Sequence, residues 1–242
     1  MNNLILGTCR LKPFISDNNN SRVISKFITR PTNTKEHLQL IKFMKYNNLT
    51  HKDFFFTFER CINNKTPINQ YKLNKIRNDF FNYDYYIIEI CSSKCHVYDN
   101  RLYSHYTAVP KKKDEFTEVR SWLTKSHLEK ISLTYLTFEE IEEDILEIQK
   151  ELNKPIIIVS HFVVKDDSKR YELKEWLKTI CKKHNIVFID PVKEMKLLDK
   201  NFTSEKYFKE QDDYPNHLTD KGNNLIKKVF QKFKRKIKIR KN

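Results

Sequence analysis

The chain has 242 residues, of which 39% are hydrophobic and 13% aromatic, and it carries a formal net charge of +15 at pH 7. This composition predicts a globular protein with one good hydrophobic core and excludes a chain too polar to fold. No apolar run approaches the roughly 20 residues that cross a membrane, so we expect no membrane span and a cytoplasmic location. The five cysteines are an odd number at low density, which is typical of reduced thiols.

The first half of the chain alternates between strand-like and helix-like patterns. A short apolar run at residues 4–6 predicts the first strand. Asn33 and Glu36 have the spacing of an N-cap and its N3 partner, which predicts the start of a helix. Further apolar runs at residues 54–56 and 85–88 predict two more strands, buried on both faces of a parallel sheet.

The second half continues this alternation. Thr137 and Glu140 form another capping-box pattern, followed by apolar residues at helical spacing. The remaining elements are, in chain order, a strand at residues 156–159, a helix along the apolar stripe from Leu173 to Cys181, a strand at residues 186–189 and a final helix after Thr219. Five short strands separated by helices predict an α/β three-layer sandwich.

The positive charge is concentrated at the C-terminal end of the sequence. From Lys227 onward nine residues are basic and none is acidic. We therefore predict one α/β domain over residues 1–226, followed over residues 227–242 by a basic helix end and tail, with Lys232 to Lys241 beyond the last apolar stripe. Such a tail attracts nucleic acid and other polyanions without specificity. A solubilising extension explains the same charge, and both interpretations stay open.

Two stretches do not fit the alternation. Residues 11–32 contain a polar run and then a strand-like segment, and residues 95–127 are irregular and rich in Tyr, His and Lys. Long insertions at the carboxyl ends of parallel strands commonly form the rim of a binding site. The chain has only two glycines, Gly7 and Gly222, and both lie in the motifs described next, where glycine permits close backbone approach and unusual dihedral angles.

Two motifs at opposite ends of the chain can form a catalytic site. Gly7-Thr8-Cys9-Arg10 puts a thiol on the turn that leaves the first strand, among backbone N–H groups that favour the thiolate. Asp213 and His217 precede the last helix. The imidazole can take the thiol proton, and the carboxylate can hold the ring in the required tautomer. A doubly wound sheet can bring the two motifs together at the carboxyl ends of its strands.

These motifs, together with the predicted strands, resemble the SGNH (GDSL-like) hydrolase superfamily. The resemblance implies a flavodoxin-like five-stranded parallel sheet with strand order 2-1-3-4-5. It also implies that Cys9 stands at the position of the family's serine nucleophile, and that His217 in the block His-Leu-Thr-x-x-Gly is the general base. Asp213 is then the residue that orients the imidazole, with Asp212 as the alternative.

The sequence departs from the family around the expected oxyanion site. Thr8 stands where the family has an aspartate, and the segment at residues 89–94 replaces the family's Gly-x-Asn-Asp. The backbone N–H of Cys9, with hydroxyl or backbone groups of Ser92 or Ser93, can bind the developing oxyanion instead. Ser92 and Ser93 are also ordinary turn residues, so their pattern allows both interpretations.

Other polar residues near the strand ends have weaker signals. Arg10 can hold an anionic group of a substrate. His161 follows the fourth predicted strand, so we expect it at the same sheet edge, lining the site or lying on its rim without a catalytic duty. Cys91, Cys95 and His96 include ligand types for zinc, but a second ligand pair at a typical spacing does not follow, and we expect no metal site.

The resemblance implies an acyl-ester hydrolase that needs no cofactor and acts through a thioester on Cys9. Its substrate would be an O-acylated carbohydrate or a small ester. The Gly-x-Cys block also resembles a polysaccharide-biosynthesis branch of this broad fold, which has a Gly-Asn-Cys-Gln segment and is linked to acyl-CoA chemistry. This second resemblance implies an acyl-CoA-dependent O-acyltransferase in glycan modification, with CoA as the donor. A catalytically inactive member that binds glycan or nucleic acid is the remaining alternative.

Overall fold

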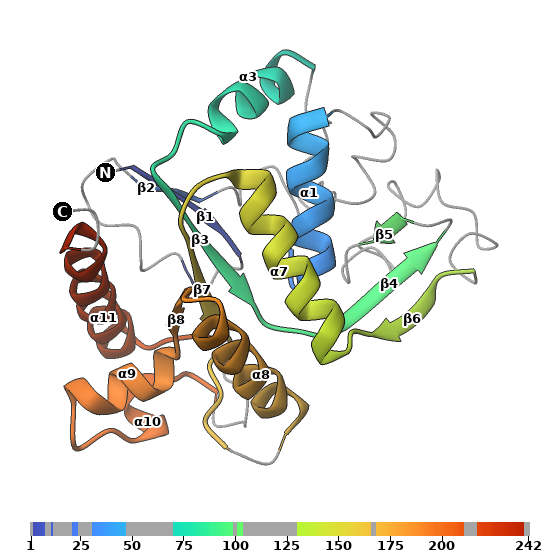
Figure 1. Cartoon of the computed structure of the whole chain (residues 1–242). Helices are drawn as coiled ribbons and strands as arrows, with labels where there is room; N and C mark the ends of the chain where they lie inside the picture. The colour runs from blue at the N-terminus through green and yellow to red at the C-terminus, as the bar shows by residue number, and fades with distance from the viewer. Residues whose placement is uncertain are drawn as a thin grey trace, which may run out of the picture. The chain divides into compact units, whose positions relative to one another are not determined.

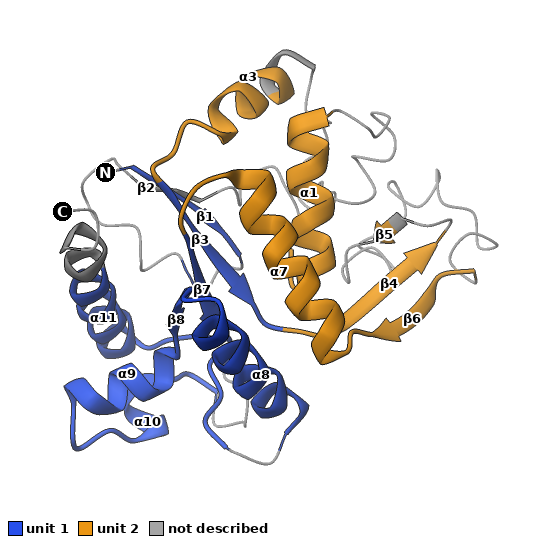
Figure 2. Cartoon of the chain, viewed as in Figure 1, with its two compact units in different colours: residues 1–23, 85–91, 156–242 blue, residues 24–84, 92–155 orange. Residues whose placement is uncertain are grey.

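A computed structural model describes residues 2–7, 11, 21–23, 31–46, 70–98, 101–103, 130–165, 168–210 and 217–239. The chain forms two compact units, coloured separately in Figure 2. Unit 1 consists of Met1–Val23, Tyr85–Cys91 and Ile156–Asn242, and unit 2 consists of Ile24–Asp84 and Ser92–Pro155. The predicted domain over residues 1–226 with a separate tail stays a prediction.

Unit 1 is built on a five-stranded parallel sheet (Figure 1). Its strands are β1 (Asn3–Leu6), β2 (Ser21–Val23), β3 (Tyr85–Ile90), β7 (Ile156–Ser160) and β8 (Val187–Ile189). They are hydrogen-bonded in the order β2-β1-β3-β7-β8. In the central strands Ile5 lies opposite Ile87, and Ile87 lies opposite Ile157. Numbered by chain order within the sheet, this is 2-1-3-4-5, so the predicted fold class and strand order are confirmed.

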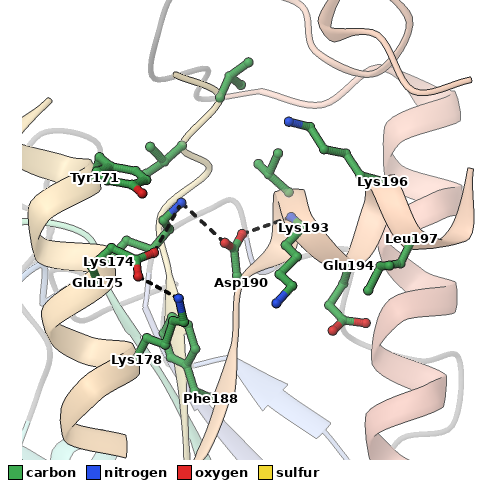
Figure 3. A pocket seen from close by; sticks show the side chains of 13 residues that line it. Tyr171, Lys174, Glu175, Lys178, Phe188, Asp190, Lys193, Glu194, Lys196 and Leu197 are labelled. Atoms are coloured by element: carbon green, nitrogen blue, oxygen red, sulfur yellow. Dashed lines mark hydrogen bonds and ion pairs between the residues drawn. The ribbon is translucent and has the colours of Figure 1, made fainter. Parts of the chain in front are cut away.

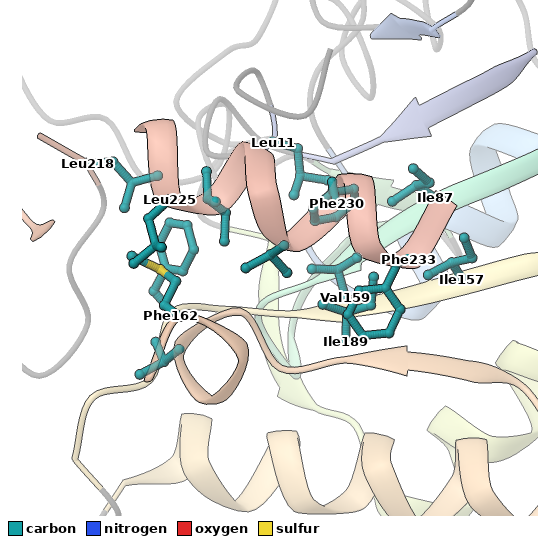
Figure 4. Packing of buried hydrophobic residues seen from close by; sticks show 14 of the residues in the cluster. Leu11, Ile87, Ile157, Val159, Phe162, Ile189, Leu218, Leu225, Phe230 and Phe233 are labelled. Atoms are coloured by element: carbon teal, nitrogen blue, oxygen red, sulfur yellow. The ribbon is translucent and has the colours of Figure 1, made fainter. Parts of the chain in front are cut away.

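Helices pack on both faces of this sheet. They are α8 (Lys169–Lys183), α9 (Pro191–Leu198), α10 (Ser204–Tyr207) and α11 (Asp220–Ile239). On one face Ile226, Val229 and Phe230 of α11 join the sheet residues in one buried cluster. Figure 4 shows α8 on the opposite side of the strands from α11. The apolar stripes predicted for α8 and α11 are therefore confirmed as core contacts, whereas α9 and α10 were not predicted.

The direction of α11 fixes where its N-terminal end lies. Leu225, near the start of the helix, lies beside Phe162, which follows β7 (Figure 4). Phe233, two turns later, lies beside Ile157 near the start of that strand (Figure 4). The helix therefore runs antiparallel to the strands and begins at their carboxyl edge, where open α/β sheets bind ligands.

The apolar stripe of α11 extends further than the sequence pattern indicated. Phe233 is buried in the core cluster, and the Lys232 ammonium lies 2.8 Å from the Glu194 carboxylate on α9. The expectation that Lys232 to Lys241 lie beyond the last apolar stripe is therefore wrong at its first residues. A Lys-Phe-Lys sequence reads as polar, but one buried aromatic residue per turn is enough to continue a packed helix face.

One strand of the sheet comes from a stretch that the pattern treated as an excursion. β2 lies within residues 11–32 and pairs in parallel with β1, with Ser21 opposite Asn3. The strand predicted at residues 54–56 lies outside the described residues. The strand-like segment noted within residues 11–32 overlaps β2 at Arg22 and Val23, but it was not counted among the five predicted strands of the sheet.

Unit 2 combines helices with a small antiparallel sheet. Its described helices are α1 (Thr34–Tyr46), α3 (Gln70–Phe80) and α7 (Phe138–Leu152), and its strands are β4 (Lys94–Tyr98), β5 (Arg101–Tyr103) and β6 (Ser132–Tyr135). The strands pair in the order β5-β4-β6. The expectation of an irregular stretch from residue 95 is therefore wrong for β4 and β5. Both strands are short and end at an aromatic residue, so they lack a clear apolar run.

Both predicted capping patterns are present. At α7 the Thr137 side chain accepts from the Glu140 N–H, and the Glu140 carboxylate accepts from the Thr137 N–H at 2.9 Å. At α1 the Asn33 side chain accepts from the Glu36 N–H at 2.8 Å. The Glu36 carboxylate reaches one residue further back, where its Oε2 accepts from the Thr32 N–H at 2.6 Å.

Glu36 is buried, and its second carboxylate oxygen has no hydrogen-bond partner among the described residues. Burial raises the pKa of the Glu36 carboxyl from its usual 4.5 to about 7, against the lowering effect of the hydrogen bonds from Thr32 and Asn33. The Glu36 carboxylate in turn acts on the Cys95 thiol and helps to raise its pKa, after burial as the main cause. Burial also raises the pKa of the Asp144 carboxyl above its usual value of 3.8.

We expect Glu36 to make unit 2 less stable as the pH rises. A carboxyl whose pKa is higher in the folded than in the unfolded state prefers to fold protonated, so the destabilisation develops between about pH 4.5 and pH 7 and is complete above pH 7. The shift corresponds to about 3 kcal/mol. In the Glu36→Gln variant, the urea midpoint of unfolding should change less with pH between about pH 4.5 and pH 7 than in the wild type. Glu143 is exposed, so in Glu143→Gln the urea midpoint should change with pH as in the wild type. The same pH dependence in both variants would contradict the assignment to Glu36.

Candidate active site

The block that begins at His217 is held in place by three structural contacts at the start of α11. Leu218 is buried and forms a β-bridge with Phe208. The Thr219 hydroxyl accepts from the Gly222 N–H at 3.1 Å and donates to the Lys206 carbonyl at 2.9 Å. Three residues of the block therefore have structural roles: Leu218 packs in the core, Thr219 caps the helix, and Gly222 allows close packing against α10.

Both glycines of the chain lie where a side chain would not fit. A Cβ atom on Gly222 would lie 2.2 Å from the Tyr207 carbonyl oxygen, and one on Gly7 would lie 2.7 Å from the Glu89 Cβ. Neither glycine has a positive φ. The glycines are therefore required by close approach of neighbouring elements, as the sequence predicted, and not by an unusual backbone conformation.

His217 is the member of the block without a packing role. Its side chain is 59% exposed. Its backbone N–H donates to Glu210 Oε2 at 2.9 Å, and its ring Nδ1 is hydrogen-bonded to Glu210 Oε1. Because an ionised carboxylate can only accept, Nδ1 carries the hydrogen in the neutral ring. The other ring nitrogen, Nε2, has no hydrogen-bond partner among the described residues and is left as the basic atom.

The pKa of the Glu210 carboxyl is held below its usual range. Partial burial acts to raise this pKa, but hydrogen bonds from the side chain and the backbone of His217 outweigh it. Glu210 is therefore ionised at neutral pH and holds the imidazole in the tautomer that a general base needs. The sequence analysis assigned this duty to Asp213 or Asp212, which both lie outside the described residues. Glu210 was missed because it lies seven positions before the histidine.

His161 lies at the end of β7, as predicted, but it is buried, with 2% exposure. Its Nδ1 lies 2.7 Å from the Phe162 carbonyl oxygen, and its Nε2 lies 2.6 Å from the Arg170 guanidinium. Since a carbonyl only accepts and a guanidinium only donates, the ring is neutral with its hydrogen on Nδ1. Nδ1 thus makes a local contact with the next residue, and Nε2 connects the end of β7 to α8. A substrate-binding duty for His161 stays a prediction.

The remaining predicted residues divide between the two units. Gly7 is buried at the carboxyl end of β1 in unit 1, while Thr8, Cys9 and Arg10 lie outside the described residues. Ser92 and Ser93 belong to unit 2. There the Ser92 hydroxyl accepts from the Lys94 N–H at 3.0 Å, and the Ser93 carbonyl accepts from the Leu136 N–H at 2.9 Å. Within unit 1, Gly7, His161 and His217 lie at the carboxyl edge of the sheet.

Glu89 is a second acidic residue that the sequence analysis did not single out. It is 1% exposed within β3, and its side chain faces the missing Cβ of Gly7. The signal was available, since Glu89 is the one charged residue in the apolar strand Tyr-Tyr-Ile-Ile-Glu-Ile. A buried carboxyl group therefore lies directly against Gly7, the first residue of the predicted Gly7-Thr8-Cys9-Arg10 motif.

The described cysteines are buried free thiols. Cys91, Cys95 and Cys181 form no disulfide, and burial raises the pKa of Cys95 and Cys181 to about 12. These two thiols are protonated at neutral pH and are poor nucleophiles. Within the described ranges there is no cluster of three His, Cys, Asp or Glu side chains that could hold a metal ion. Likewise, none of the helices described has the length and hydropathy that a membrane crossing requires.

The sheet and its helices define a doubly wound α/β protein with a His–Glu pair at the carboxyl edge. A family model described as the TviD N-terminal domain matches residues 100–206. A search of curated proteins found no match.

Several solved structures are similar along most of their length. One is a catalytic mutant of Axe2, an acetylxylan esterase from Geobacillus stearothermophilus, with 11% identity, 96% of this chain and 92% of that chain covered, and a TM-score of 0.41. LAE5, an alpha/beta hydrolase from the metagenome of Lake Arreo, Spain, has 10% identity, 96% and 93% coverage and a TM-score of 0.42. A protein from Parabacteroides merdae described as a GDSL-like lipase has 12% identity, 95% and 93% coverage and a TM-score of 0.41. The fold class rests on the strand order and parallel register given above.

Proposed function

We propose that the protein is an acyl-ester-processing enzyme in which Cys9 is the nucleophile and His217, oriented by Glu210, is the general base. The observation that carries this proposal is the His217–Glu210 pair at the start of α11. The ring is exposed, its Nδ1 is held by an ionised carboxylate, and its Nε2 is available. A side chain with no packing role that is nevertheless held in one orientation is typical of a general base.

The first half of the reaction forms a thioester. Nε2 of His217 takes the proton of the Cys9 thiol while the sulfur attacks the ester carbonyl carbon, and the carbonyl oxygen becomes an oxyanion. When this intermediate collapses, the bond from carbon to the alkoxy oxygen breaks. The proton on Nε2 then passes to that oxygen, and the alcohol leaves. Glu210 stays ionised and stabilises the imidazolium that exists between these two proton transfers.

The second half releases the acyl group. In a hydrolase, Nε2 removes a proton from water as the water oxygen attacks the thioester, the carbon–sulfur bond breaks, and the thiolate recovers its proton from the ring. In an O-acyltransferase, the hydroxyl of an acceptor takes the place of water in the same steps. The motif does not distinguish the two. We place hydrolysis first because an exposed histidine is accessible to water.

The substrate class that we propose is an O-acylated carbohydrate. The resemblance of the Gly-x-Cys and His-Leu-Thr-x-x-Gly blocks to the SGNH superfamily supports an ester substrate. The match of residues 100–206 to the carbohydrate-related TviD N-terminal domain supports a sugar acceptor. This match covers parts of both units and ends before Glu210 and His217.

Mass spectrometry of the trapped acyl-enzyme tests this function. After a short incubation with an activated acetyl ester, we expect one acetyl group on the peptide that contains Cys9, and none on Cys95 or Cys181, whose thiols are protonated. Cys9→Ala should abolish both the adduct and ester turnover, whereas the control Cys61→Ala should retain them.

The same experiment with acetyl-CoA separates hydrolase from transferase. Rapid release of acetate from the ester, with little labelling by acetyl-CoA, supports the hydrolase. A stable Cys9 adduct from acetyl-CoA that is discharged only by an added glycan supports the transferase. Labelling at Cys61 instead of Cys9, with turnover retained in Cys9→Ala, would rule out the proposed nucleophile.

A further inference from the structure

A cavity of about 440 Å³ lies between α8 and α9 in unit 1 (Figure 3). Val163 and Val164, which follow β7, and Asp190, which follows β8, contribute to its walls. The cavity therefore opens at the carboxyl edge of the parallel sheet, where proteins of this architecture bind ligands. Its volume is within the range of roughly 300–1,000 Å³ that is typical of small-molecule sites.

Charged side chains surround the cavity, and its carboxylates are already paired. Glu175 lies 2.6 Å from the Lys178 ammonium, and Glu194 lies 2.8 Å from the Lys232 ammonium. Asp190 caps α9 by accepting from the Lys193 N–H at 3.0 Å. The carboxylates lining the cavity are thus held by neighbouring donors and do not call for a bound cation.

Lys174 also lines the cavity and pairs with Asp190. Its side chain is only 9% exposed, and its ammonium lies 3.5 Å from Asp190 and 4.3 Å from the centre of the Tyr171 ring. A buried ammonium needs such partners, because an unpaired charge is expensive to bury. Lys174 therefore forms an ion pair with Asp190 and lies 3.9 Å from the Glu175 carboxylate as well.

Two further lysines line the cavity without a carboxylate partner. Lys193 and Lys196 lie three residues apart on α9, and neither ammonium forms an ion pair within the part of the chain that the structure describes. Lys196 lies over the Phe202 ring at 5.8 Å. Figure 3 shows the two side chains leaving α9 in different directions. Each ammonium can therefore pair separately with an anionic group.

The rest of the wall is apolar. Phe188 and Tyr171 supply aromatic rings, and Val163 and Val192 supply aliphatic contacts (Figure 3). An apolar wall with a few cationic groups suits a ligand that has both an uncharged ring and an anionic group. Inorganic phosphate alone would leave this wall unused.

We propose that the cavity between α8 and α9 is a binding site for a mononucleotide-sized ligand, with its phosphate group paired to Lys193 or to Lys196 and its ring against the apolar wall. The site is separate in composition from the His217–Glu210 pair, since no residue of that pair lines the cavity. The inference does not depend on the chemistry of Cys9.

Isothermal titration calorimetry of the full chain with ADP, adenosine and inorganic phosphate tests the proposal. We expect ADP to bind more tightly than either fragment and to lose affinity as salt is added. Lys193→Gln combined with Lys196→Gln should weaken ADP binding by about tenfold, because each exposed ammonium contributes a modest charge pair. The control combines Lys182→Gln with Lys200→Gln, two exposed lysines that do not line the cavity, and should bind ADP like the wild type.

Each alternative result counts against the site. If ADP does not bind at millimolar concentration, or if both double variants lose affinity equally, the cavity is not a phosphate site. If inorganic phosphate binds as tightly as ADP, the apolar wall does not contribute to binding the adenine ring, and this part of the proposal is wrong. All four substitutions are at exposed positions, so unfolding of the variants does not complicate the comparison, and the single variants show which lysine holds the phosphate.

Discussion

Replacing His217 with alanine should reduce turnover of an activated acetyl ester by about 10²–10⁴-fold, the range typical of a lost general base. Glu210→Gln should reduce turnover by a comparable or smaller factor. A glutamine can donate its amide hydrogens to Nδ1 and so stabilise the wrong tautomer of the ring. Initial rates at saturating ester, with the adduct on Cys9 followed in parallel, would measure both effects.

Two comparisons show whether these losses concern chemistry or folding. The His217 side chain is exposed and packs against nothing in the core, so the urea midpoint of His217→Ala should stay close to that of the wild type. Glu205→Gln removes an exposed carboxylate from the nearby helix α10 and should leave turnover unchanged. Full ester turnover in His217→Ala would show that His217 is not the general base. Equal losses of turnover in the Glu210 and Glu205 variants would show that the effect comes from the change in charge and not from the contact with His217.

Gly222→Ala should lower the free energy of unfolding by about 2–4 kcal/mol, near the upper end for overpacking. The added Cβ would lie 2.2 Å from the Tyr207 carbonyl oxygen, and a backbone atom cannot swing aside as a side chain can. The better helix propensity of alanine offsets only about 1 kcal/mol of this. Urea denaturation followed by circular dichroism measures the difference.

The neighbouring Asn224 provides the matched control. Asn224 is exposed on the same turn of α11, so Asn224→Ala should leave stability unchanged or raise it slightly. A Gly222→Ala variant as stable as Asn224→Ala would show that α10 can move away from α11 without loss. If α10 does move, the loop that carries Glu210 moves with it, and ester turnover should then fall although the protein stays folded.

Much of unit 1 could be predicted because its signals are local. The apolar runs of β1, β3 and β7 and the stripe of α11 follow from burial on one or both faces of an element. β2 was noted only as a strand-like segment and not as a strand of the sheet, because three residues with a serine and an arginine do not form an apolar run. The antiparallel sheet of unit 2 was missed for a related reason. The four residues of β6 are all exposed, and their pairing with β4 depends on contacts distant in sequence.

The part of the candidate site that could be predicted is the histidine that directly precedes the start of a helix. His217 could be found because it precedes a capping threonine and a glycine that must be small. Glu210 could not, because the carboxylate that meets Nδ1 depends on the path of the chain between α10 and α11. The resemblance pointed to Asp213, which lies outside the described residues, whereas Glu210 bonds to His217 from seven residues away.

The interleaved connectivity of the two units has a consequence for how the chain can fold. Unit 2 consists of two long segments, Ile24–Asp84 between β2 and β3 and Ser92–Pro155 between β3 and β7. Bringing the ends of such long segments together is entropically unfavourable, so the central strands cannot pair early unless the intervening chain is already compact. Packing of α1 on α7, through pairs such as Lys42 with Glu147 and Lys45 with Glu151, shortens the effective distance on both sides of β3. The sheet that carries the site therefore depends, for the speed of its formation, on residues that are not part of it.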